Sequence, residues 1–262
     1  MMIDCTDKES AILKLVGSCA QQLQLPCYLV GGFVRDKLLQ RACKDLDFVC
    51  VGDGIALAQE VARRFSPQPQ VSVFKTFGTA NIKVDGFEIE FVGARKESYA
   101  AHSRKPEVEP GTLEDDQRRR DFTINALAIS LNKEDFGTLI DPFNGVEDLK
   151  LKLIRTPLEP GTTFSDDPLR MMRAVRFASQ LNFSIVPETW LGIIENAHRL
   201  HIISKERIAD ELNKIVLSPK PSIGFDLLYK SGLLKLFFPQ MVDLAGAEYI
   251  DGKGHKDNFY HT

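Results

Sequence analysis

Apolar positions along the first half of the chain alternate between the spacing of helices and the spacing of strands. Residues 8–24 carry apolar side chains every three or four positions, which predicts an amphipathic helix that ends before Pro26. Helical spacing returns at 34–39 and 55–65. Short apolar runs predict strands at 27–30, 46–51, 71–74, 79–84 and 87–92. The pattern therefore predicts a mixed β-sheet with flanking helices.

The pattern changes at two places further along the chain. Residues 95–120 hold few apolar side chains but seven basic and six acidic ones, which predicts a mobile, charged loop. Helical spacing resumes at Asp121 and dominates after Asp141-Pro142. Four helices are expected in that second half, at 166–181, 188–198, 205–217 and 221–230.

These patterns predict an α+β fold. A domain with a mixed sheet is expected at 1–140 and an all-helical domain at 141–245. The composition of the 262 residues, 44% hydrophobic and 26% charged, is typical of folded rather than disordered proteins. No apolar run approaches the roughly 18 residues of a membrane-spanning helix.

The cysteines and the first residues predict a cytoplasmic protein. Cysteines occur at 5, 19, 27, 43 and 50, and this odd number without a C-x-x-C pair indicates free thiols and argues against zinc. The N-terminus lacks the basic start and apolar core of a signal peptide. A formal net charge of -3 argues against a uniformly basic nucleic-acid surface, although it leaves local patches open.

Two aspartates at the start of a predicted strand are candidate metal ligands. Asp45 and Asp47 are two residues apart, so both side chains point to one face of the strand, where they repel each other unless a cation lies between them. Their oxygen ligands suit Mg²⁺. The preceding Gly31-Gly32 pair, between a strand and a helix, allows a phosphate to approach the backbone. The simpler alternatives are a solvated carboxylate pair and an ordinary glycine turn.

A third carboxylate for this site lies in the strand predicted at 87–92. Glu88 and Glu90 both fit, because alternation places them on the same face of that strand. Spacing alone does not choose between them, and a solvent-facing strand explains at least one of the two.

Two arginine-rich segments follow. Arg118-Arg119-Arg120 is predicted to open a helix and could hold phosphates, with Asp121 as a possible cap and Asn125 one turn later on the same face. A solvated charge run is the alternative. In the second segment Pro168 suits the first helical position and Asp167 the N-cap. Arginines recur there every three residues, at 170, 173 and 176.

A capped amphipathic helix with a basic face accounts for that second segment. It leaves unexplained why all three basic residues are arginine, whose planar fork makes bidentate contacts that lysine lacks.

Taken together, these segments resemble the class II tRNA nucleotidyltransferases, which are CCA-adding enzymes, and the related bacterial poly(A) polymerases of the polymerase β nucleotidyltransferase superfamily. The resemblance covers roughly residues 25–215, in the order of the family motifs. The matching segments are 29–36, 44–47, 119–128, 141–145, 148–149, 154–155, 167–170 and 176–178. The resemblance implies a nucleotidyltransferase head domain followed by a helical neck.

The resemblance also implies roles for particular residues. Asp45 and Asp47 would be the metal-binding carboxylates, with Glu90, five residues before Arg95, preferred over Glu88 as the third catalytic one. Gly32 and Arg35 would contact the triphosphate, and Asp167 with Arg170 would recognise the base. The full nucleotide-binding set would be Gly31, Gly32, Arg35, Arg120, Asp121, Asn125, Asp167, Arg170, Arg173 and Arg176. Asp166 stands where the family often has glutamate, a change from which we expect little consequence.

The activity that the resemblance implies is template-independent addition of CMP and AMP, from CTP and ATP, to the 3′ end of tRNA with Mg²⁺. Cytosine and adenine each present an amine donor beside a ring-nitrogen acceptor, which Asp167 and Arg170 would complement. Uracil and guanine present the opposite pattern and would leave buried charge unpaired.

Alternatives are a poly(A) polymerase, a non-catalytic RNA-binding relative, and an antibiotic-type nucleotidyltransferase, which would lack the arginine helix. The charged loop at 95–120 argues against an enzyme that adds only C-C. Residues 254–262 resemble the opening of an HD domain, which implies that a further, truncated domain begins at 246–262. We expect His255 and His261 in a surface turn. The sequence leaves the oligomeric state open.

Overall fold

A seven-stranded mixed sheet forms the centre of the first of two units, residues 1–151, in the computed structural model. Only β2 and β5 run parallel, and every other neighbouring pair is antiparallel. In spatial order the strands are β3 (Val71–Phe74), β4 (Thr79–Val84), β5 (Phe87–Gly93), β2 (Asp45–Cys50), β1 (Cys27–Val30), β8 (Ala128–Ser130) and β9 (Leu139–Ile140). The predicted mixed sheet is confirmed.

The structure describes residues 3–75, 78–98, 107–246, 249–250, 253–254 and 257–261. No helix among these residues is long and apolar enough to cross a membrane.

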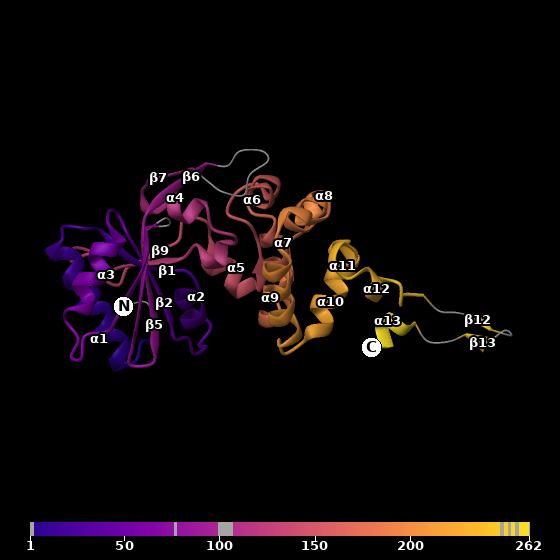
Figure 1. The fold of residues 1–262 in the computed structure, drawn as a ribbon, viewed down its shortest axis with the longest axis horizontal. Helices are drawn as coiled ribbons and strands as arrows, with labels where there is room; N and C mark the ends of the chain where they lie inside the picture. The colour runs from indigo at the N-terminus through magenta and orange to yellow at the C-terminus, as the bar shows by residue number, and fades with distance from the viewer. Residues whose placement is uncertain are drawn as a thin grey trace. The chain divides into compact units, whose positions relative to one another are not determined.

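The two faces of the sheet differ in polarity. One face carries fully buried apolar side chains, and Phe48 of β2 stacks there on Phe91 of β5 with ring centres 5.4 Å apart. Helices α1 (Asp7–Gln22) and α3 (Gly54–Ala62) lie on one side of the sheet, and α2 (Gly32–Leu38) lies on the other (Figure 1). Because side chains alternate along a strand, the acidic residues of β2 and β5 fall on the face opposite to the phenylalanines. This asymmetry leaves one face of the sheet free for polar chemistry.

The segment expected to be a loop at 95–120 contains regular structure. Strand β6 (Arg95–Ser98) pairs with β7 (Glu107–Pro110), and helix α4 (Leu113–Arg118) follows. A reciprocal capping box between Thr112 and Asp115 starts this helix. Residues 99–106, the middle of the expected loop, lie outside the described residues.

The helix expected from Asp121 onward is wrong. The arginine triplet ends α4 rather than opening a helix, and only a short 3₁₀ turn, η2 (Thr123–Asn125), follows. The chain then enters β8, where Ala128 pairs with Val30 of β1. Completing the sheet beside β1 outweighs the helical spacing of the apolar side chains, which are buried in the observed conformation.

The first unit extends past the predicted boundary at residue 140. Helix α5 (Gly145–Leu151) begins where the Asp141 carboxylate accepts hydrogen bonds from the backbone amides of Gly145 and Val146, at 2.7 and 2.9 Å. The Thr123 hydroxyl donates to Asp148 at 2.7 Å and ties α5 to η2. Residues 141–151 therefore belong to the sheet-containing unit.

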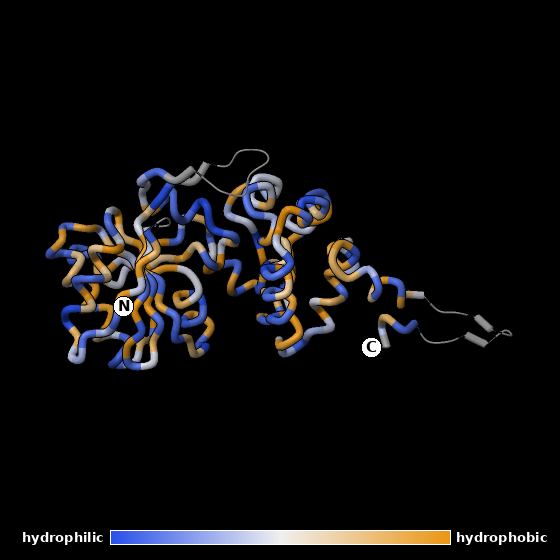
Figure 2. Tube along the Cα trace, viewed as in Figure 1, coloured by the Kyte–Doolittle hydropathy of each residue, from blue (hydrophilic) through white to orange (hydrophobic). Residues whose placement is uncertain are grey.

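The second unit, residues 152–262, is mostly helical, as predicted. Its helices are α6 (Pro160–Asp166), α7 (Leu169–Leu181), α8 (Pro187–Asn196), η3 (Ala197–Ile202), α9 (Lys205–Val216), α10 (Pro221–Lys230), α11 (Leu233–Phe237), α12 (Pro239–Val242) and α13 (Asn258–His261). Hydrophobic and hydrophilic positions alternate along these helices (Figure 2). The helix expected at 166–181 begins only at Leu169, because Asp167, the residue before Pro168, is held in an extended conformation.

Two small strand pairs add to the helices of the second unit. Strands β10 (Leu153–Ile154) and β11 (Ser184–Ile185) are parallel, and β12 (Tyr249–Ile250) pairs with β13 (Lys253–Gly254). In the HD-like tail, His261 is the last residue of α13, whereas His255 lies outside the described residues. The tail prediction therefore stays a prediction.

Candidate active site

The parallel pairing of β2 with β5 brings the predicted carboxylates together. In this register Asp47 lies opposite Glu90 and Asp45 lies opposite Glu88. Paired residues on neighbouring strands share a face and lie about 4.8 Å apart. Asp45 is exposed at the start of β2, whereas Asp47 and Glu90 are half-buried. The structure therefore provides a row of four acidic residues, two of them partly shielded from water.

Glu88 and Glu90 have different surroundings. The Glu88 carboxylate is largely exposed and forms an ion pair with Lys83, with Nζ 2.5 Å from Oε1. Burial raises the pKa of Glu90, and the charge of Asp47 raises it further, against the opposing effect of Arg95. This arrangement favours Glu90, which shares its electrostatic environment with Asp47, as the third carboxylate.

The surroundings of Asp47 suit a divalent cation. Burial raises the pKa of Asp47, the guanidinium of Arg120 opposes that rise, and the neighbouring Asp45 adds to it. Carboxylates that resist ionisation beside each other gain most from a bound cation. Among the described residues, no three His, Cys, Asp or Glu side chains form a ready-made metal cage. Mg²⁺ is commonly held by one or two carboxylates together with substrate phosphates, so the donor set present fits it.

Gly31 lies at the junction of β1 and α2, directly beside Asp47. Its backbone has a φ of 75°, which favours glycine. A Cβ atom at this position would lie 2.8 Å from Nη1 of Arg120 and 3.6 Å from Oδ2 of Asp47. The absence of a side chain therefore lets a carboxylate, a guanidinium and the backbone of the turn meet in one place.

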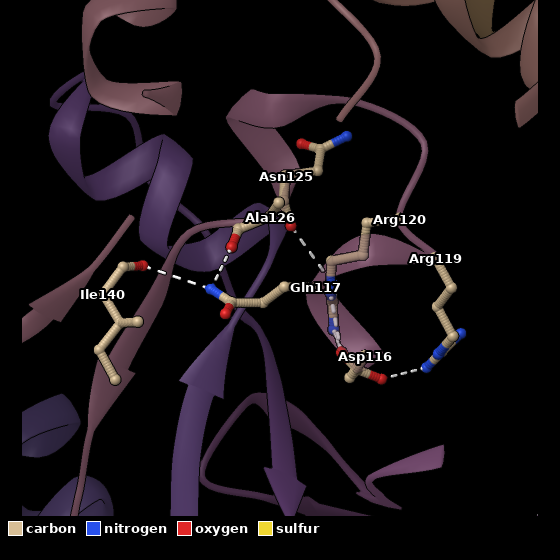
Figure 3. A network of polar contacts seen from close by, with 7 residues as sticks. All are labelled: Asp116, Gln117, Arg119, Arg120, Asn125, Ala126 and Ile140. Atoms are coloured by element: carbon tan, nitrogen blue, oxygen red, sulfur yellow. Dashed lines mark hydrogen bonds and ion pairs between the residues drawn. The ribbon is translucent and has the colours of Figure 1, made fainter. Parts of the chain in front are cut away.

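Arg120 is held in this position by a buried carboxylate. Its Nε and Nη2 atoms lie 3.0 and 2.8 Å from Oδ2 of Asp116, and Arg119 contacts the other oxygen (Figure 3). Its Nη1 donates to the Asn125 carbonyl at 3.4 Å. The neighbouring Gln117 amide donates at 2.7 Å to the carbonyl of Ala126.

Asp116 is fully buried, and its role was missed in the sequence. Its position three and four residues before Arg119 and Arg120 was the available signal, because such pairs face each other on a helix. Burial alone would raise the pKa of Asp116, but the charges of Arg120 and Arg119 outweigh it and lower that pKa.

A second group of hydrogen-bonded polar side chains lies near Gly32. Arg35 is buried and makes a bidentate contact with its neighbour Asp36, with both distances 2.9 Å. Its Nη1 also donates to the Asn125 side chain at 2.6 Å. The Asn125 amide donates in turn to Asp121 at 2.9 Å. The structure thus brings together Arg35, Arg120, Asp121 and Asn125 of the predicted set, with Asn125 contacting both arginines.

In the second unit, Asp167 lies at the start of α7. Its Oδ1 accepts from the backbone amide of Leu169 at 3.1 Å, and its Oδ2 lies 3.1 Å from Nη2 of Arg207 in α9. Arg170 is buried and donates from Nη1 to the Thr163 carbonyl at 3.3 Å. A carboxylate oxygen has more than one lone pair, so Asp167 can accept a hydrogen bond from a base edge in addition to these contacts.

The other two arginines of α7 contact one aromatic ring. The guanidinium carbons of Arg173 and Arg176 lie 5.6 and 4.3 Å from the centre of the Phe177 ring. Arg176 is buried, with its Nε 3.0 Å from Glu211 of α9. This pair ties α7 to α9, a structural role that the sequence analysis did not anticipate.

Two family models match the chain. The Poly A polymerase head domain matches residues 27–155, and the probable RNA and SrmB-binding site of polymerase A matches residues 182–244. The head-domain match contains the acidic row, Gly31 and the Asp116 network.

Individual relatives agree with these matches. The A-adding tRNA nucleotidyltransferase of Aquifex aeolicus is 46% identical over 193 residues, which cover 71% of this chain and 23% of that protein. The CCA-adding enzyme of Anoxybacillus flavithermus is 40% identical over 216 residues, covering 82% of this chain and 52% of the relative.

A solved structure is similar as well. The crystal structure of a tRNA nucleotidyltransferase complexed with a primer tRNA and an incoming ATP analog superposes with a TM-score of 0.75 at 37% identity, covering 87% of this chain and 66% of that one. The chain thus spans between about a quarter and two thirds of the lengths of these proteins.

Replacing Asp116 with asparagine tests the buried network. Because a buried charge left without its partner costs about 3–5 kcal/mol, we expect D116N to lower the free energy of unfolding by about 3 kcal/mol at pH 7. The pKa of Asp116 is lowered in the folded state, so this contribution is fully present above the ordinary aspartate pKa of 3.8. It is lost as the pH falls further, through the folded-state pKa.

Urea denaturation of the wild type and D116N between pH 7 and pH 3 measures this difference. The exposed Glu114, which pairs with Arg118 one turn along α4, supplies the control E114Q, expected to change stability by less than about 0.5 kcal/mol. Equal effects of the two substitutions would show that Asp116 does not stabilise the arginines.

Replacing each glycine of the turn with alanine tests whether Gly31, and not Gly32, is required for the conformation of the turn. In G31A a Cβ would combine a positive φ with overlap of Arg120, so we expect a loss of about 1–2 kcal/mol in the free energy of unfolding. In G32A the new Cβ would lie 3.6 Å from Arg35, an ordinary contact, and we expect a change below about 0.5 kcal/mol. Thermal unfolding of both variants checks this, and an equally unstable G32A contradicts it.

Proposed function

The chain belongs to the class II CCA-adding and poly(A) polymerase family, and from this premise we propose that it transfers nucleotides from CTP and ATP to the 3′ end of tRNA. The observation that carries the proposal is the pair of carboxylates, Asp47 and Glu90, on in-register strands beside Gly31 and Arg120. Nucleotidyl transfer needs oxygen ligands for divalent cations next to groups that hold a polyphosphate, and this place offers both.

Within the first unit, the chain's own residues have distinct tasks in this proposal. Asp45, Asp47 and Glu90 would hold Mg²⁺, which when bound supplies charge neutralisation at the phosphates and activates the attacking hydroxyl. Arg120 and the backbone at Gly31-Gly32 would orient the triphosphate next to these carboxylates.

The hydrogen-bonded side chains around the Gly31-Gly32 turn have a separate task. Asp116 keeps Arg120 in one orientation, because both its Nε and its Nη2 are engaged by the carboxylate. Arg35, Asp121 and Asn125 would fix the nucleotide from behind the turn, through the side-chain hydrogen bonds that join them.

Base recognition is proposed for the second unit. Asp167 would accept a hydrogen bond from the exocyclic amine of cytosine or adenine, and Arg170 would donate to the adjacent ring nitrogen. Uracil or guanine would present a carbonyl to the carboxylate and an N–H to the guanidinium. Arg207, 3.1 Å from one carboxylate oxygen of Asp167, would hold this side chain in place for that contact. Arg173 and Arg176 would line the same base pocket.

The main alternative is repeated addition of AMP, as expected for a poly(A) polymerase. The relatives favour tRNA as the substrate, because they are named for adding A or C-C-A to tRNA. All five cysteines are free thiols, which is consistent with action in the cytoplasm, the compartment we propose.

Incubating the chain with tRNA that lacks its terminal C-C-A tests the proposed function directly. With CTP, ATP and Mg²⁺ we expect addition of cytidine and adenosine only, because the proposed base contacts admit only these two bases. We expect the product to end at C-C-A, the addition for which the CCA-adding relatives are named. High-resolution gel electrophoresis of the product measures it, with CTP alone and ATP alone as comparisons. A long A tract would favour the poly(A) alternative, and an unextended tRNA would contradict catalysis by this chain.

The matched variants E90Q and E88Q test the choice of the third carboxylate. Because Glu90 shares its surroundings with Asp47, we expect E90Q to reduce the rate of single-nucleotide incorporation by about 10²–10³-fold. Because Glu88 is exposed and paired with Lys83, E88Q should change that rate by less than about threefold. Single-turnover kinetics with saturating CTP measures both, and the reverse order would assign the role to Glu88.

A further inference from the structure

The polar face of the sheet continues past the acidic row onto β4 and β3. Asn81 of β4 lies opposite Glu90, and Ser72 of β3 lies opposite Asn81. One row of polar side chains therefore crosses four strands, from Ser72 through Asn81 and Glu90 to Asp47. At about 4.8 Å per strand, Asn81 is one step from Glu90 and Ser72 is two.

A cavity of about 330 Å³ occupies this outer part of the face. It is lined by Gln70, Ser72, Phe74, Asn81 and Lys83, all from β3, β4 and the residue before β3. Its volume falls in the range of small-molecule sites. Phe74 is 53% exposed, so part of its ring is accessible for stacking.

The geometry of the proposed reaction indicates which part of the substrate lies near the cavity. The groups suited to the triphosphate, Arg120 and the Gly31 backbone, lie on the β1 side of Asp47. In phosphoryl transfer the attacking and leaving oxygens lie roughly in line across the phosphorus. If the pyrophosphate leaves towards β1, the attacking hydroxyl approaches from the β5 side, which is where the cavity lies.

We propose that this cavity binds the 3′-terminal nucleoside of the RNA that is to be extended, with its base stacked on Phe74. The proposal rests on the proposed function, since it assigns the attacking hydroxyl to that nucleoside. Asn81 and Ser72 offer neutral donors and acceptors for the ribose or the base edge. Stacking on an aromatic ring tolerates every base, which suits a 3′ end whose last base changes as nucleotides are added.

The chemistry of the lining also favours a nucleoside over a second triphosphate. Lys83, the positively charged side chain that lines the cavity, forms an ion pair with Glu88, with its Nζ 2.5 Å from Oε1. The other lining residues are neutral, so the site lacks the clustered charge that a polyphosphate needs. A base and ribose match a neutral, partly aromatic surface.

Fluorescence quenching of an RNA oligonucleotide that ends in 2-aminopurine tests the stacking without requiring catalysis. Binding to the wild-type chain should quench the fluorophore, and F74A should lose at least half of that quenching at saturating protein. The control F136A removes another partly exposed phenylalanine of the same unit, 38% exposed, and should quench like the wild type. Equal quenching by all three proteins would overturn the proposal.

Steady-state incorporation kinetics supplies the second measurement. F74A and N81A should each raise KM for the RNA by about tenfold and leave KM for CTP within about twofold, as expected when one stacked or hydrogen-bonded nucleoside is lost. An increase in KM for CTP instead would assign the cavity to the incoming nucleotide and overturn the proposal. A wild-type chain that quenches but does not extend RNA would refute the proposed function while supporting the stacking site.

Discussion

The repulsion between two carboxylates on one face of a sheet is the constraint on which the rest of the site depends. Asp47 and Glu90 are placed side by side by the parallel register of β2 and β5, and burial raises the pKa of both. Arg120 offsets part of this repulsion, and the buried Asp116 keeps Arg120 in place. The fold therefore stabilises a site whose remaining negative charge is best matched by a divalent cation.

The sheet accommodates these neighbouring carboxylates because its two faces differ in polarity. Phe48 and Phe91 alternate with the acidic residues on the same two strands and stack in the core beneath α1 and α3. The opposite face is left polar across several strands, with the groups proposed to bind phosphate at Gly31 and a neutral, partly aromatic cavity beyond Glu90. One sheet can thus hold the groups for the leaving side and for the attacking side of a single phosphoryl transfer.

Much of this could be predicted from residues that are close together in the sequence. The alternation in β2 placed Asp45 and Asp47 on one face, and the Gly31-Gly32 turn was visible between a strand and a helix. What could not be predicted depends on distant contacts. The pairing of β2 with β5 joins strands separated by about forty residues. The different surroundings of Glu88 and Glu90 depend on such distant contacts, so in the sequence the preference for Glu90 rested on resemblance alone.

The region after Asp121 shows the same limit. Its apolar side chains have helical spacing, but the segment pairs with the edge of β1 and forms β8.

Manganese binding measured by electron paramagnetic resonance tests the central claim most directly, because Mn²⁺ replaces Mg²⁺ at oxygen ligands. With CTP present, the wild-type chain should immobilise Mn²⁺, and Asp47→Asn should release it into the free pool. Equal retention of Mn²⁺ by the variant would contradict a cation site built on the paired carboxylates.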